Sequence, residues 1–531
     1  MSDKPKTVTE HLNSISYEND EGYIPSRFSL DFVNFIKLVN GGEGEENRTP
    51  VMHYRMLDTM CGDDPNVCNM ACRGSAKTSL AEYLFLYLGV YGELPGFGTV
   101  FLALYVGDSI ENGVKNMRKT LEFRWENSDF LRKYIPETRF TDNRYEFTNI
   151  AGKKFIVKAY GAKTGLRGSK EMGKRPTLAI LDDLISDDDA RSQTVIAAVE
   201  DVVYKAVDYA LHPSKSKIIW SGTPFNARDP LYKAVESGAW TVNVFPVCEQ
   251  FPCKRDEFKS VWPDRFTYNY VWKKYKKAVK AGKTDTFNQE LMLRIMSEEE
   301  RIIMDSDIRW YPRESVISKI SAFNTYITTD FATGEDEASD FSCINVWALN
   351  NKGFLFWIDG YCRKSLMDRN LDELFRLAQK WKIQSAGLEI AGQQKGFVKL
   401  IQNKMIDENN YFGLAKAIGS SQIGLRPVKD KMSRFQQSAV PLFKAGKIFF
   451  PEELKTSEEL AEILDELNLA TVKGFKSKHD DQIDTITMLG EMEMWRPSEV
   501  TTEDETEFSE GVDEIWDDGG DIEEESSSYF V

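Results

Sequence analysis

The segment ACRGSAKTS, residues 71–79, has the residue types of a loop that binds phosphate groups. An apolar stretch precedes it and the helix-favouring SLAEYLFLYL follows it, so the free N–H groups of a helix start would face the anion. In such a loop Lys77 would reach the β- and γ-phosphates, and Thr78 would bind Mg²⁺ through its hydroxyl. The candidate nucleotide-binding residues of the loop are Arg73, Gly74, Ser75, Ala76, Lys77 and Thr78.

Two alanines distinguish this loop from the standard motif G-x-x-x-x-G-K-[ST]. Ala71 and Ala76 stand at the two glycine positions. A lysine–threonine pair at the start of an ordinary helix is therefore the alternative interpretation of the loop taken alone.

Two further segments supply groups that a nucleotide hydrolase requires. Four apolar residues followed by two acids, LAILDD at 178–183, predict a buried strand with carboxylates at its end. Asp182 is placed to hold Mg²⁺, directly or through water, and Asp183 to polarise the attacking water, although either acid could instead cap the next turn. A third strand ends in SGTP, residues 221–224, a polar exit suited to sensing the γ-phosphate. The three elements in this order predict a phosphate-loop NTPase that uses ATP and Mg²⁺.

Arginine would supply the cation that stabilises transfer of the γ-phosphoryl group. Arg73 lies in the loop itself, and Arg167 lies in the glycine-rich run GAKTGLRGSK, residues 161–170. Either arginine could act within its own chain or from a neighbouring subunit. Arg167 could equally contact DNA phosphates or be solvated.

A second group of acidic residues follows a different pattern. Asp330 ends one predicted strand, Glu389 ends another, and HDDQIDTITML at 479–489 opens a helix that carries Asp481 and Asp484 on one face. Converging carboxylates repel each other unless divalent cations neutralise them, and two metals about 3.5–4 Å apart suit phosphodiester hydrolysis. Oxygen ligands alone favour Mg²⁺ or Mn²⁺ over zinc. These residues predict a two-metal nuclease site in a ribonuclease-H-like fold.

Further polar residues flank this predicted site. Asp340 and Asp480 are additional candidate ligands, and His479 could protonate the leaving group or act as a cap. Lys431 and Arg434 share one predicted helical face, where they would contact a DNA backbone or be solvated.

Two alternations of strands and helices would position these residues. Apolar runs at 66–71, 99–107, 153–160, 177–182 and 217–222 predict a mainly parallel α/β sheet. Runs at 325–331, 341–349 and 353–361 predict an antiparallel meander, followed by a helix near 366–381 and a strand at 384–390. We expect an N-terminal arm (residues 1–45), an ATPase domain (46–245), a connector (246–318), a nuclease domain (319–497) and an acidic tail (498–531).

Most of the net negative charge is concentrated in the last 35 residues of the sequence. The chain of 531 residues carries a net charge of −17, but residues 497–531 hold 14 acids and no Lys or Arg. Subtracting these 14 from 84 acids leaves 70 against 67 basic residues, a net of −3, so the body is nearly neutral and the tail should be solvated and disordered. Seven cysteines are too few for a disulfide framework, and no membrane span or signal peptide is recognisable, which favours a cytosolic protein with free thiols.

The order of these motifs resembles the large terminase subunit of tailed bacteriophages. The resemblance covers roughly residues 50–495 and rests on the loop with its arginine, the glycine-rich arginine run, LAILDD, SGTP, TFNQELMLRI, ITTDFA, LEI, KxxRF and HDDQIDT. It implies an ASCE-type phosphate-loop NTPase joined to a ribonuclease-H-like nuclease. Residues that match the ATPase pattern are Arg73, Lys77, Thr78, Asp182 and Asp183, and those that match the nuclease pattern are Asp330, Glu389 and Asp484.

The resemblance also implies a biological setting. An ATP-driven motor would thread double-stranded viral DNA through the portal into the procapsid, and the nuclease would cut concatemeric DNA. Partners would be the portal, a small terminase subunit and further copies in a ring, commonly a pentamer, in the host cytoplasm and absent from the mature virion. Two departures from the family are the loop alanines and Asp183, where the family usually has glutamate, one methylene longer.

Two other functions fit parts of the sequence. A DNA helicase or repair translocase with a fused nuclease would need a second motor core, and only one is visible. A non-catalytic scaffold would bind ATP in its degenerate loop as a conformational clamp.

Overall fold

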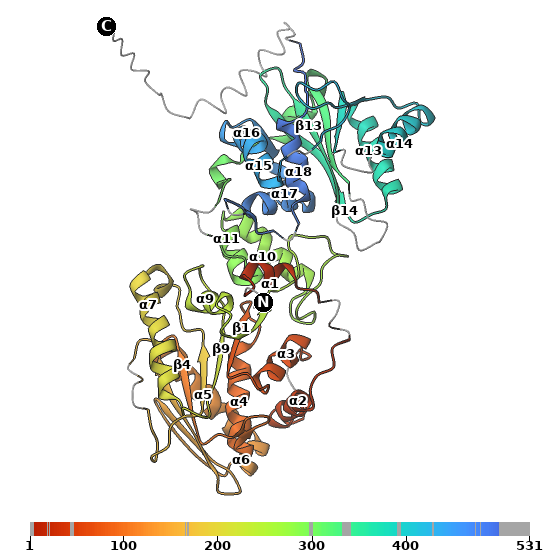
Figure 1. The fold of residues 1–531 in the computed structure, drawn as a ribbon. Helices are drawn as coiled ribbons and strands as arrows, with labels where there is room; N and C mark the ends of the chain where they lie inside the picture. Colours follow the sequence, from red (N-terminus) through yellow and green to blue (C-terminus); the bar gives the residue numbers. More distant parts are fainter. Residues whose placement is uncertain are drawn as a thin grey trace, which may run out of the picture. The chain divides into compact units, whose positions relative to one another are not determined.

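The computed structural model describes residues 5–17, 20, 22–42, 47–164, 166, 169–296, 301–331, 341–389, 395–426, 429–472, 474–477 and 479–498. Contacts divide the chain into two units, which we describe separately (Figure 1). Unit 1 comprises Met1–Asp305 and Leu454–Ile483, and unit 2 comprises Ser306–Glu453 and Asp484–Val531. Three features of the sequence, namely Arg167, Asp340 and the acidic tail beyond residue 498, lie outside the described residues.

An eight-stranded sheet forms the centre of unit 1. Six of its strands run parallel, and the last two extend it antiparallel. The strand that leads to the predicted phosphate loop (β1) and the strand that leads to the paired acids (β8) are separated by β9. The mainly parallel α/β sheet is confirmed. In spatial order the strands are β10 (Thr241–Phe245), β1 (Asn66–Ala71), β9 (Lys217–Gly222), β8 (Leu178–Asp182), β4 (Leu102–Gly107), β7 (Lys154–Gly161), β6 (Arg144–Thr148) and β5 (Glu137–Thr141).

Strand alternation gives this sheet two apolar faces. In β4, Ala103 and Tyr105 belong to one core cluster, and Leu104 and Val106 belong to the other. Helices that contribute to the first cluster are α2 (Arg27–Val39), α3 (Val51–Met60), α4 (Lys77–Tyr91), α5 (Lys115–Glu126) and α6 (Asp129–Tyr134). Helices that contribute to the second are α1 (Val8–Asn13), α7 (Gln193–Asp201) and α9 (Pro230–Glu236).

Helix α4 is apolar around most of its circumference, and accordingly it is buried along almost its whole length. Tyr87 of α4 packs its ring edge-on against Phe35 of α2, at 5.4 Å between centroids. The segment before residue 45 therefore contributes to the main core, a role that its sequence does not reveal. None of the helices in the described part of the chain is long and apolar enough to cross a membrane.

A late segment of the sequence completes unit 1. Helix α17 (Glu458–Asn468) places Ala461 in the first core cluster, which also holds residues of α10 (Tyr268–Lys280) and α11 (Thr284–Phe287). Burial raises the pKa of Asp465 to about 7, and the nearby Arg294 guanidinium opposes that rise. Arg294 donates to the backbone carbonyl of Lys476, beside the hairpin of β18 (Ala470–Thr471) and β19 (Gly474–Phe475).

Unit 2 is built on a seven-stranded mixed sheet. Its middle strands β12, β13 and β14 form the expected antiparallel meander, and β15 adds to β12 in parallel. Helices α13 (Met367–Trp381) and α14 (Lys395–Asp407) contribute to the core cluster on one face (Figure 1). In spatial order the strands are β11 (Arg309–Tyr311), β17 (Ile448–Pro451), β14 (Leu355–Arg363), β13 (Ser342–Leu349), β12 (Asn324–Asp330), β15 (Ser385–Leu388) and β16 (Gly413–Leu414).

The opposite face of this sheet is polar near its centre. Asn345 of β13 donates to the Thr485 hydroxyl at 2.7 Å and accepts a hydrogen bond from the Trp357 indole at 2.7 Å. Thr485 lies on α18 (Asp481–Thr487), so this helix lies over that face, together with α15 (Lys431–Arg434) and α16 (Val440–Lys444) (Figure 1).

One expectation about the cysteines is corrected. Cys343 and Cys362 stand directly opposite each other on β13 and β14, with their Cα atoms 4.1 Å apart, and they form a disulfide. The pairing depends on strand register, which the spacing of cysteines in the sequence does not show. Cys61, Cys68, Cys72, Cys248 and Cys253 are free thiols.

Candidate functional sites

The predicted phosphate loop connects β1 to α4 with two residues in the left-handed region. Gly74 has φ 82°, and Ala76, immediately before the helix, has φ 60°. This conformation costs an alanine roughly 1–2 kcal/mol of free energy, whereas glycine adopts it freely. The backbone thus keeps a turn that favours glycine although the second motif position holds alanine.

Lys77 is buried at the start of α4 and contacts the loop backbone. Its Nζ lies 3.3 Å from the Ala71 carbonyl oxygen, 3.4 Å from that of Cys72 and 2.8 Å from the Thr223 hydroxyl. Thr223 belongs to SGTP, and its backbone N–H donates to Asp183 Oδ1 at 3.1 Å. The third predicted element is therefore connected to both the lysine and the second acid.

Asp182 has a carboxylate oxygen that the protein leaves unsatisfied. Its Oδ1 is buried and has no hydrogen-bond partner among the described residues, whereas Oδ2 accepts from the Tyr105 hydroxyl at 3.3 Å. Burial, reinforced by the charge of Asp183, raises the pKa of Asp182 to about 7, against the lowering effect of a hydrogen bond from Thr78. A buried carboxylate oxygen beside a threonine hydroxyl fits a hard divalent cation.

Several residues of the predicted nucleotide site line one cavity of about 550 Å³. Arg73 forms an ion pair with Glu290, 2.8 Å from Nη1 to Oε1, and both side chains line the cavity. The sequence analysis did not single out Glu290, although it lies within the quoted segment TFNQELMLRI. Other residues that line the cavity include Thr78, Asp182, Asp183 and Thr223.

An aromatic region lies behind the loop. His53 Nε2 is 2.7 Å from the Ser75 carbonyl oxygen, and burial lowers the pKa of His53 to about 4, so the neutral imidazole donates this bond. The His53 ring packs edge-on against Trp262 at 4.9 Å, and both residues line a cavity of about 340 Å³ that also includes Ala76.

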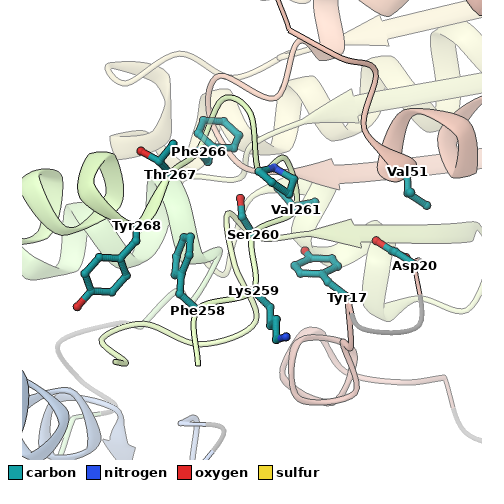
Figure 2. A pocket seen from close by; sticks show the side chains of 11 residues that line it. Tyr17, Asp20, Val51, Phe258, Lys259, Ser260, Val261, Phe266, Thr267 and Tyr268 are labelled. Carbon is teal, nitrogen blue, oxygen red and sulfur yellow. The ribbon is translucent and has the colours of Figure 1, made fainter. Parts of the chain in front are cut away.

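A third hollow, of about 660 Å³, is lined in part by Phe266. The Phe266 ring is close enough to Gly74 that an added Cβ would meet it at 3.6 Å. Figure 2 shows Phe266 at the rim of this hollow together with Phe258, Tyr268 and Tyr17. Apart from Ala76, the residues of the two aromatic cavities were not predicted from the sequence, because their side chains carry no motif.

In unit 2 the register of two strands brings Asp330 and Glu389 together. Thr329 pairs with Leu388 in parallel, and the two acids are the next residues on β12 and after β15. Ile327 and Leu388 belong to the core on the side of α13 and α14, so alternation directs Asp330 and Glu389 to the opposite face, where α18 lies.

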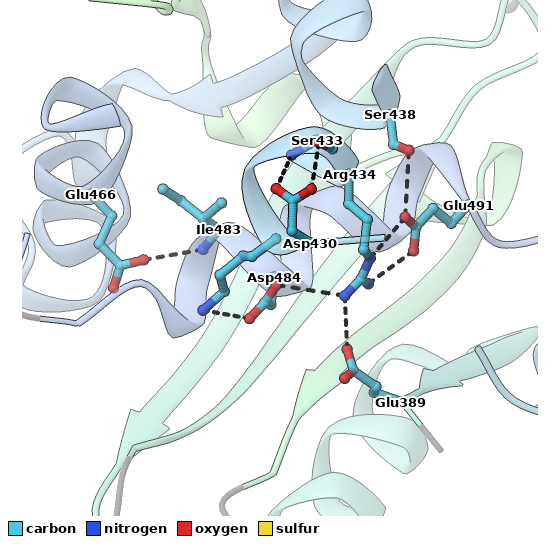
Figure 3. A network of polar contacts seen from close by, with 10 residues as sticks. Glu389, Asp430, Ser433, Arg434, Ser438, Glu466, Ile483, Asp484 and Glu491 are labelled. Carbon is cyan, nitrogen blue, oxygen red and sulfur yellow. Dashed lines mark hydrogen bonds and ion pairs between the residues drawn. The ribbon is translucent and has the colours of Figure 1, made fainter. Parts of the chain in front are cut away.

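Asp484 of α18 and Glu389 both contact the same arginine, Arg434 (Figure 3). Arg434 Nη1 lies 3.3 Å from Glu389 Oε2 and 4.0 Å from Asp484 Oδ1. Its Nε and Nη2 bind the two carboxylate oxygens of Glu491 at 3.0 and 2.9 Å. Burial and the charge of Asp484 raise the pKa of Glu389, and Arg434 opposes this rise. The structure thus gathers three carboxylates around one guanidinium, and Glu491 is a member that no sequence signal indicated.

The expectation that Arg434 contacts a DNA backbone is corrected. Its side chain is only 7% exposed and points into the carboxylates, because Glu491, 57 positions away, supplies a bidentate partner. Lys431 also faces inward, with Nζ 2.6 Å from Asp484 Oδ2.

The remaining predicted ligands are close to Asp484 in the sequence. Asp481 begins α18, and His479 and Asp480 precede it. Within the described ranges, no three His, Cys, Asp or Glu side chains are already arranged around a point that could hold a metal ion. The carboxylates nevertheless recruit an ammonium and a guanidinium, so their charge and oxygen donors fit divalent cations.

Comparisons with known proteins were made for the whole chain. No family model and no curated protein matches it. Among solved structures, the large terminase of bacteriophage HK97 is 13% identical, covers 87% of this chain and 98% of its own, and has a TM-score of 0.36. The ATPase domain of the Thermus phage P74-26 large terminase is 11% identical over 53% of this chain and 97% of its own, with a TM-score of 0.32.

A nuclease structure is also similar. The large terminase nuclease of the thermophilic phage G20c, solved with bound zinc, is 17% identical over 32% of this chain and 81% of its own, with a TM-score of 0.22. The three structures are a complete bacteriophage large terminase and two separate domains of such proteins.

Proposed function

We propose that the chain is a terminase large subunit. Unit 1 would hydrolyse ATP to move double-stranded viral DNA through the portal into the procapsid, and unit 2 would cut concatemeric DNA. The observation that carries this proposal is the presence, on one chain, of a phosphate loop joined to strand-end acids and a separate carboxylate group that gathers cations.

The contacts of unit 1 suggest how its residues would act on ATP. Lys77 would exchange the carbonyls of Ala71 and Cys72 for the β- and γ-phosphates, and Thr78 and Asp182 would hold Mg²⁺, which neutralises phosphate charge. Asp183, oriented by the Thr223 N–H, would accept a hydrogen bond from the attacking water and turn it toward the γ-phosphate.

The arginine that completes the site would come from one of two places. Arg73 would have to leave Glu290 to reach a γ-phosphate, and this ion pair would therefore hold it back until nucleotide binds. Arg167 would act in its own chain or across a subunit boundary. The base of the nucleotide would occupy the cavity beside Trp262, which adjoins the start of α4.

In unit 2, Asp330, Glu389 and Asp484 would bind two Mg²⁺ or Mn²⁺ ions. Bound metals would activate water and stabilise the leaving oxygen. The carboxylates would hold the ions on the sheet face under α18. His479, which precedes α18 in the sequence, would protonate the leaving group.

The proposed partners follow from this role. The chain would act as a homo-oligomeric ring, a pentamer on the portal, with a small terminase subunit that selects the DNA. It would work in the host cytoplasm and leave before the virion matures.

One experiment separates this function from the alternatives. ATP hydrolysis by the full chain is measured with and without double-stranded DNA, in wild type and Lys77→Ala. DNA-stimulated turnover that depends on Lys77 supports the motor, and no Lys77-dependent turnover under any condition favours the ATP-clamped scaffold. Strand separation by the isolated chain would favour the helicase or repair translocase.

A further inference from the structure

Helix α10 concentrates positive charge on unit 1 (Figure 1). Residues 265–284 contain seven Lys or Arg and no Asp or Glu, in a chain whose net charge is −17. Because exposed charges are screened beyond about 10 Å at 0.1 M salt, a local excess can attract a polyanion whatever the net charge of the whole chain. Five of the seven cations lie on α10 itself, namely Lys273, Lys274, Lys276, Lys277 and Lys280.

Three of these lysines lie on the side of the helix opposite its buried side. Lys273, Lys277 and Lys280 recur at a spacing of four and three, and all three are exposed. We call these three residues the lysine face. At 3.6 residues per turn, they are half a turn away from the buried residues of α10, which are Tyr268, Val271, Tyr275 and Val279.

The lysine face is not neutralised within the protein. Among the described residues, none of its three lysines forms an ion pair, and α10 itself carries no acid. Lysines on other helices of unit 1 differ in this respect. Lys115 and Lys205 each pair with an acid four residues away, at 2.6 and 2.7 Å. The lysine face therefore presents three ammonium groups to solvent.

Aromatic packing holds the helix that carries the lysine face. The Trp272 ring stacks against Tyr268 and Tyr275, with centroids 5.9 and 5.7 Å apart and interplanar angles of 11° and 23°. The Thr267 side chain caps the helix start by accepting a hydrogen bond from the Tyr270 N–H at 3.3 Å. The backbone of α10 is thus fixed, and its lysines keep a constant spacing.

Arg255 extends the lysine face toward the start of α10. Its Nη2 donates to Asn269 Oδ1 at 2.6 Å, and its guanidinium lies 4.6 Å from the centroid of the Tyr268 ring. Asn269 precedes Lys273 by four residues and so lies on the same side of the helix. From Asn269 to Lys280 the helix rises by roughly 16 Å, over which a DNA duplex carries about ten phosphate charges.

We propose that the lysine face of α10 is a docking surface for the phosphate backbone of double-stranded DNA. The inference rests on the proposed function, in which unit 1 moves DNA, and it names the surface of unit 1 that contacts this substrate. The binding is independent of base sequence, because contacts to phosphate carry no sequence information. A motor that moves a whole genome requires contacts of this kind.

The composition of the face favours DNA over an acidic protein segment. A flexible acidic peptide loses conformational entropy on docking and needs apolar anchors to offset that loss. Along α10, whose residues are all described, Tyr270 is the one large hydrophobic side chain that is exposed, at 39%. A duplex is already ordered, and it binds ammonium groups by releasing its condensed counter-ions.

Binding of a fluorescent duplex to the full-length chain tests the proposal. The duplex has an arbitrary sequence, and nucleotide is absent while a chelator prevents cutting. The variant combines Lys273→Gln, Lys277→Gln and Lys280→Gln. It should bind at least about tenfold more weakly than wild type at 0.1 M salt, and the slope of log affinity against log salt should fall by about 2 to 3. Because the three side chains are exposed, the variant should unfold at the wild-type temperature.

Two further triple variants serve as controls. Lys119→Gln, Lys133→Gln and Lys153→Gln together remove the same charge from other exposed positions of unit 1. Their combination should leave DNA affinity within about twofold of wild type, since screening limits the reach of each charge. Arginine at positions 273, 277 and 280 keeps the charge, so the combined Lys273→Arg, Lys277→Arg and Lys280→Arg variant should retain wild-type affinity.

The outcomes separate failure of the lysine face from failure of the proposed function. Wild-type affinity in the glutamine variant of the lysine face, or an equal loss in the control glutamine variant, would overturn the docking surface and leave the motor proposal intact. Wild type that binds no duplex at any salt concentration would contradict both. A labelled peptide of residues 498–531 tests the other occupant. Peptide binding that disappears in the glutamine variant, while DNA affinity stays unchanged, would overturn the assignment to DNA in favour of an acidic protein segment.

Discussion

The backbone N–H of Thr223 donates to Asp183 Oδ1 at 3.1 Å, although the two residues lie 40 positions apart in the chain. The hydroxyl of the same threonine accepts a hydrogen bond from the Lys77 ammonium at 2.8 Å and donates one to the Ala71 carbonyl at 2.7 Å. One residue therefore connects the phosphate loop to the acid proposed to orient water. We expect a γ-phosphate that binds or leaves at Lys77 to affect Asp183 through this single residue.

Removing only the hydroxyl of Thr223 tests this connection. In Thr223→Val the N–H that orients Asp183 remains, but Lys77 loses its closest partner, and we expect kcat for ATP to fall about tenfold. Thr223→Ser keeps the hydroxyl and serves as the control. Steady-state ATP hydrolysis measures both, and a Val variant as active as the Ser variant would show that the contact has no catalytic part.

The two activities should be separable by substitution. Lys77→Ala removes the ammonium at the phosphate loop, so ATP turnover should be abolished, whereas Mn²⁺-dependent DNA cutting should persist because unit 2 holds its own carboxylates. Both are measured on the same folded preparation. Loss of both activities would contradict the division of labour.

Asp330→Ala makes the reciprocal test. It removes a strand-end carboxylate next to Glu389, so DNA cleavage should fall to background while ATP hydrolysis stays at the wild-type rate. Plasmid nicking and linearisation in Mn²⁺ provide the measurement. Cutting that continued undiminished would remove Asp330 from the proposed metal ligands.

His53 should make the protein sensitive to acid. Burial lowers its pKa from 6.5 to about 4, so the folded state keeps the imidazole neutral while the unfolded chain protonates it. The stabilisation is fully present above pH 6.5 and is lost as pH falls toward 4, at a cost of about 2 kcal/mol by pH 5. His53→Gln can keep the bond to the Ser75 carbonyl without titrating, so wild type should lose more stability than the variant between pH 7.5 and 5. Calorimetric unfolding at both pH values provides the comparison, and parallel losses would contradict the assignment.

The acidic tail should be dispensable for both activities of the isolated protein. Deleting residues 498–531 removes 14 acids and no basic residue, and we expect ATP hydrolysis and DNA cutting to remain within about twofold of wild type. A large fall in melting temperature after the deletion would show that these residues are structural.

Features set by local order in the sequence were predictable. Apolar runs that end in acids located β8 and Asp182, and the strands of the meander located Asp330, because alternation and strand termini are properties of short segments. The helix start at Lys77 followed from its neighbours in the same way. Each of these predictions needed no more than about ten consecutive residues.

Features set by distant partners were not predictable. Arg434 has the sequence neighbours of an exposed helical cation, but acidic partners far along the chain, including Glu491 and Glu389 at 57 and 45 positions, bind it in the interior. Cys343 and Cys362 meet through strand register, and His53 finds Ser75 through packing of α3. With one sequence, nothing marks such pairs, because each partner alone is compatible with a solvated role.

The discontinuous construction of unit 1 governs how the chain can be dissected. A fragment that stops at residue 305 would omit Ala461 from its core and would strand the buried Arg294 cation without Asp465. Arg301 binds Asn468 at 2.6 Å, so the two stretches of unit 1 meet close to that cut. A fragment meant to contain all of unit 1 would therefore have to include residues 454–483 as well as residues 1–305.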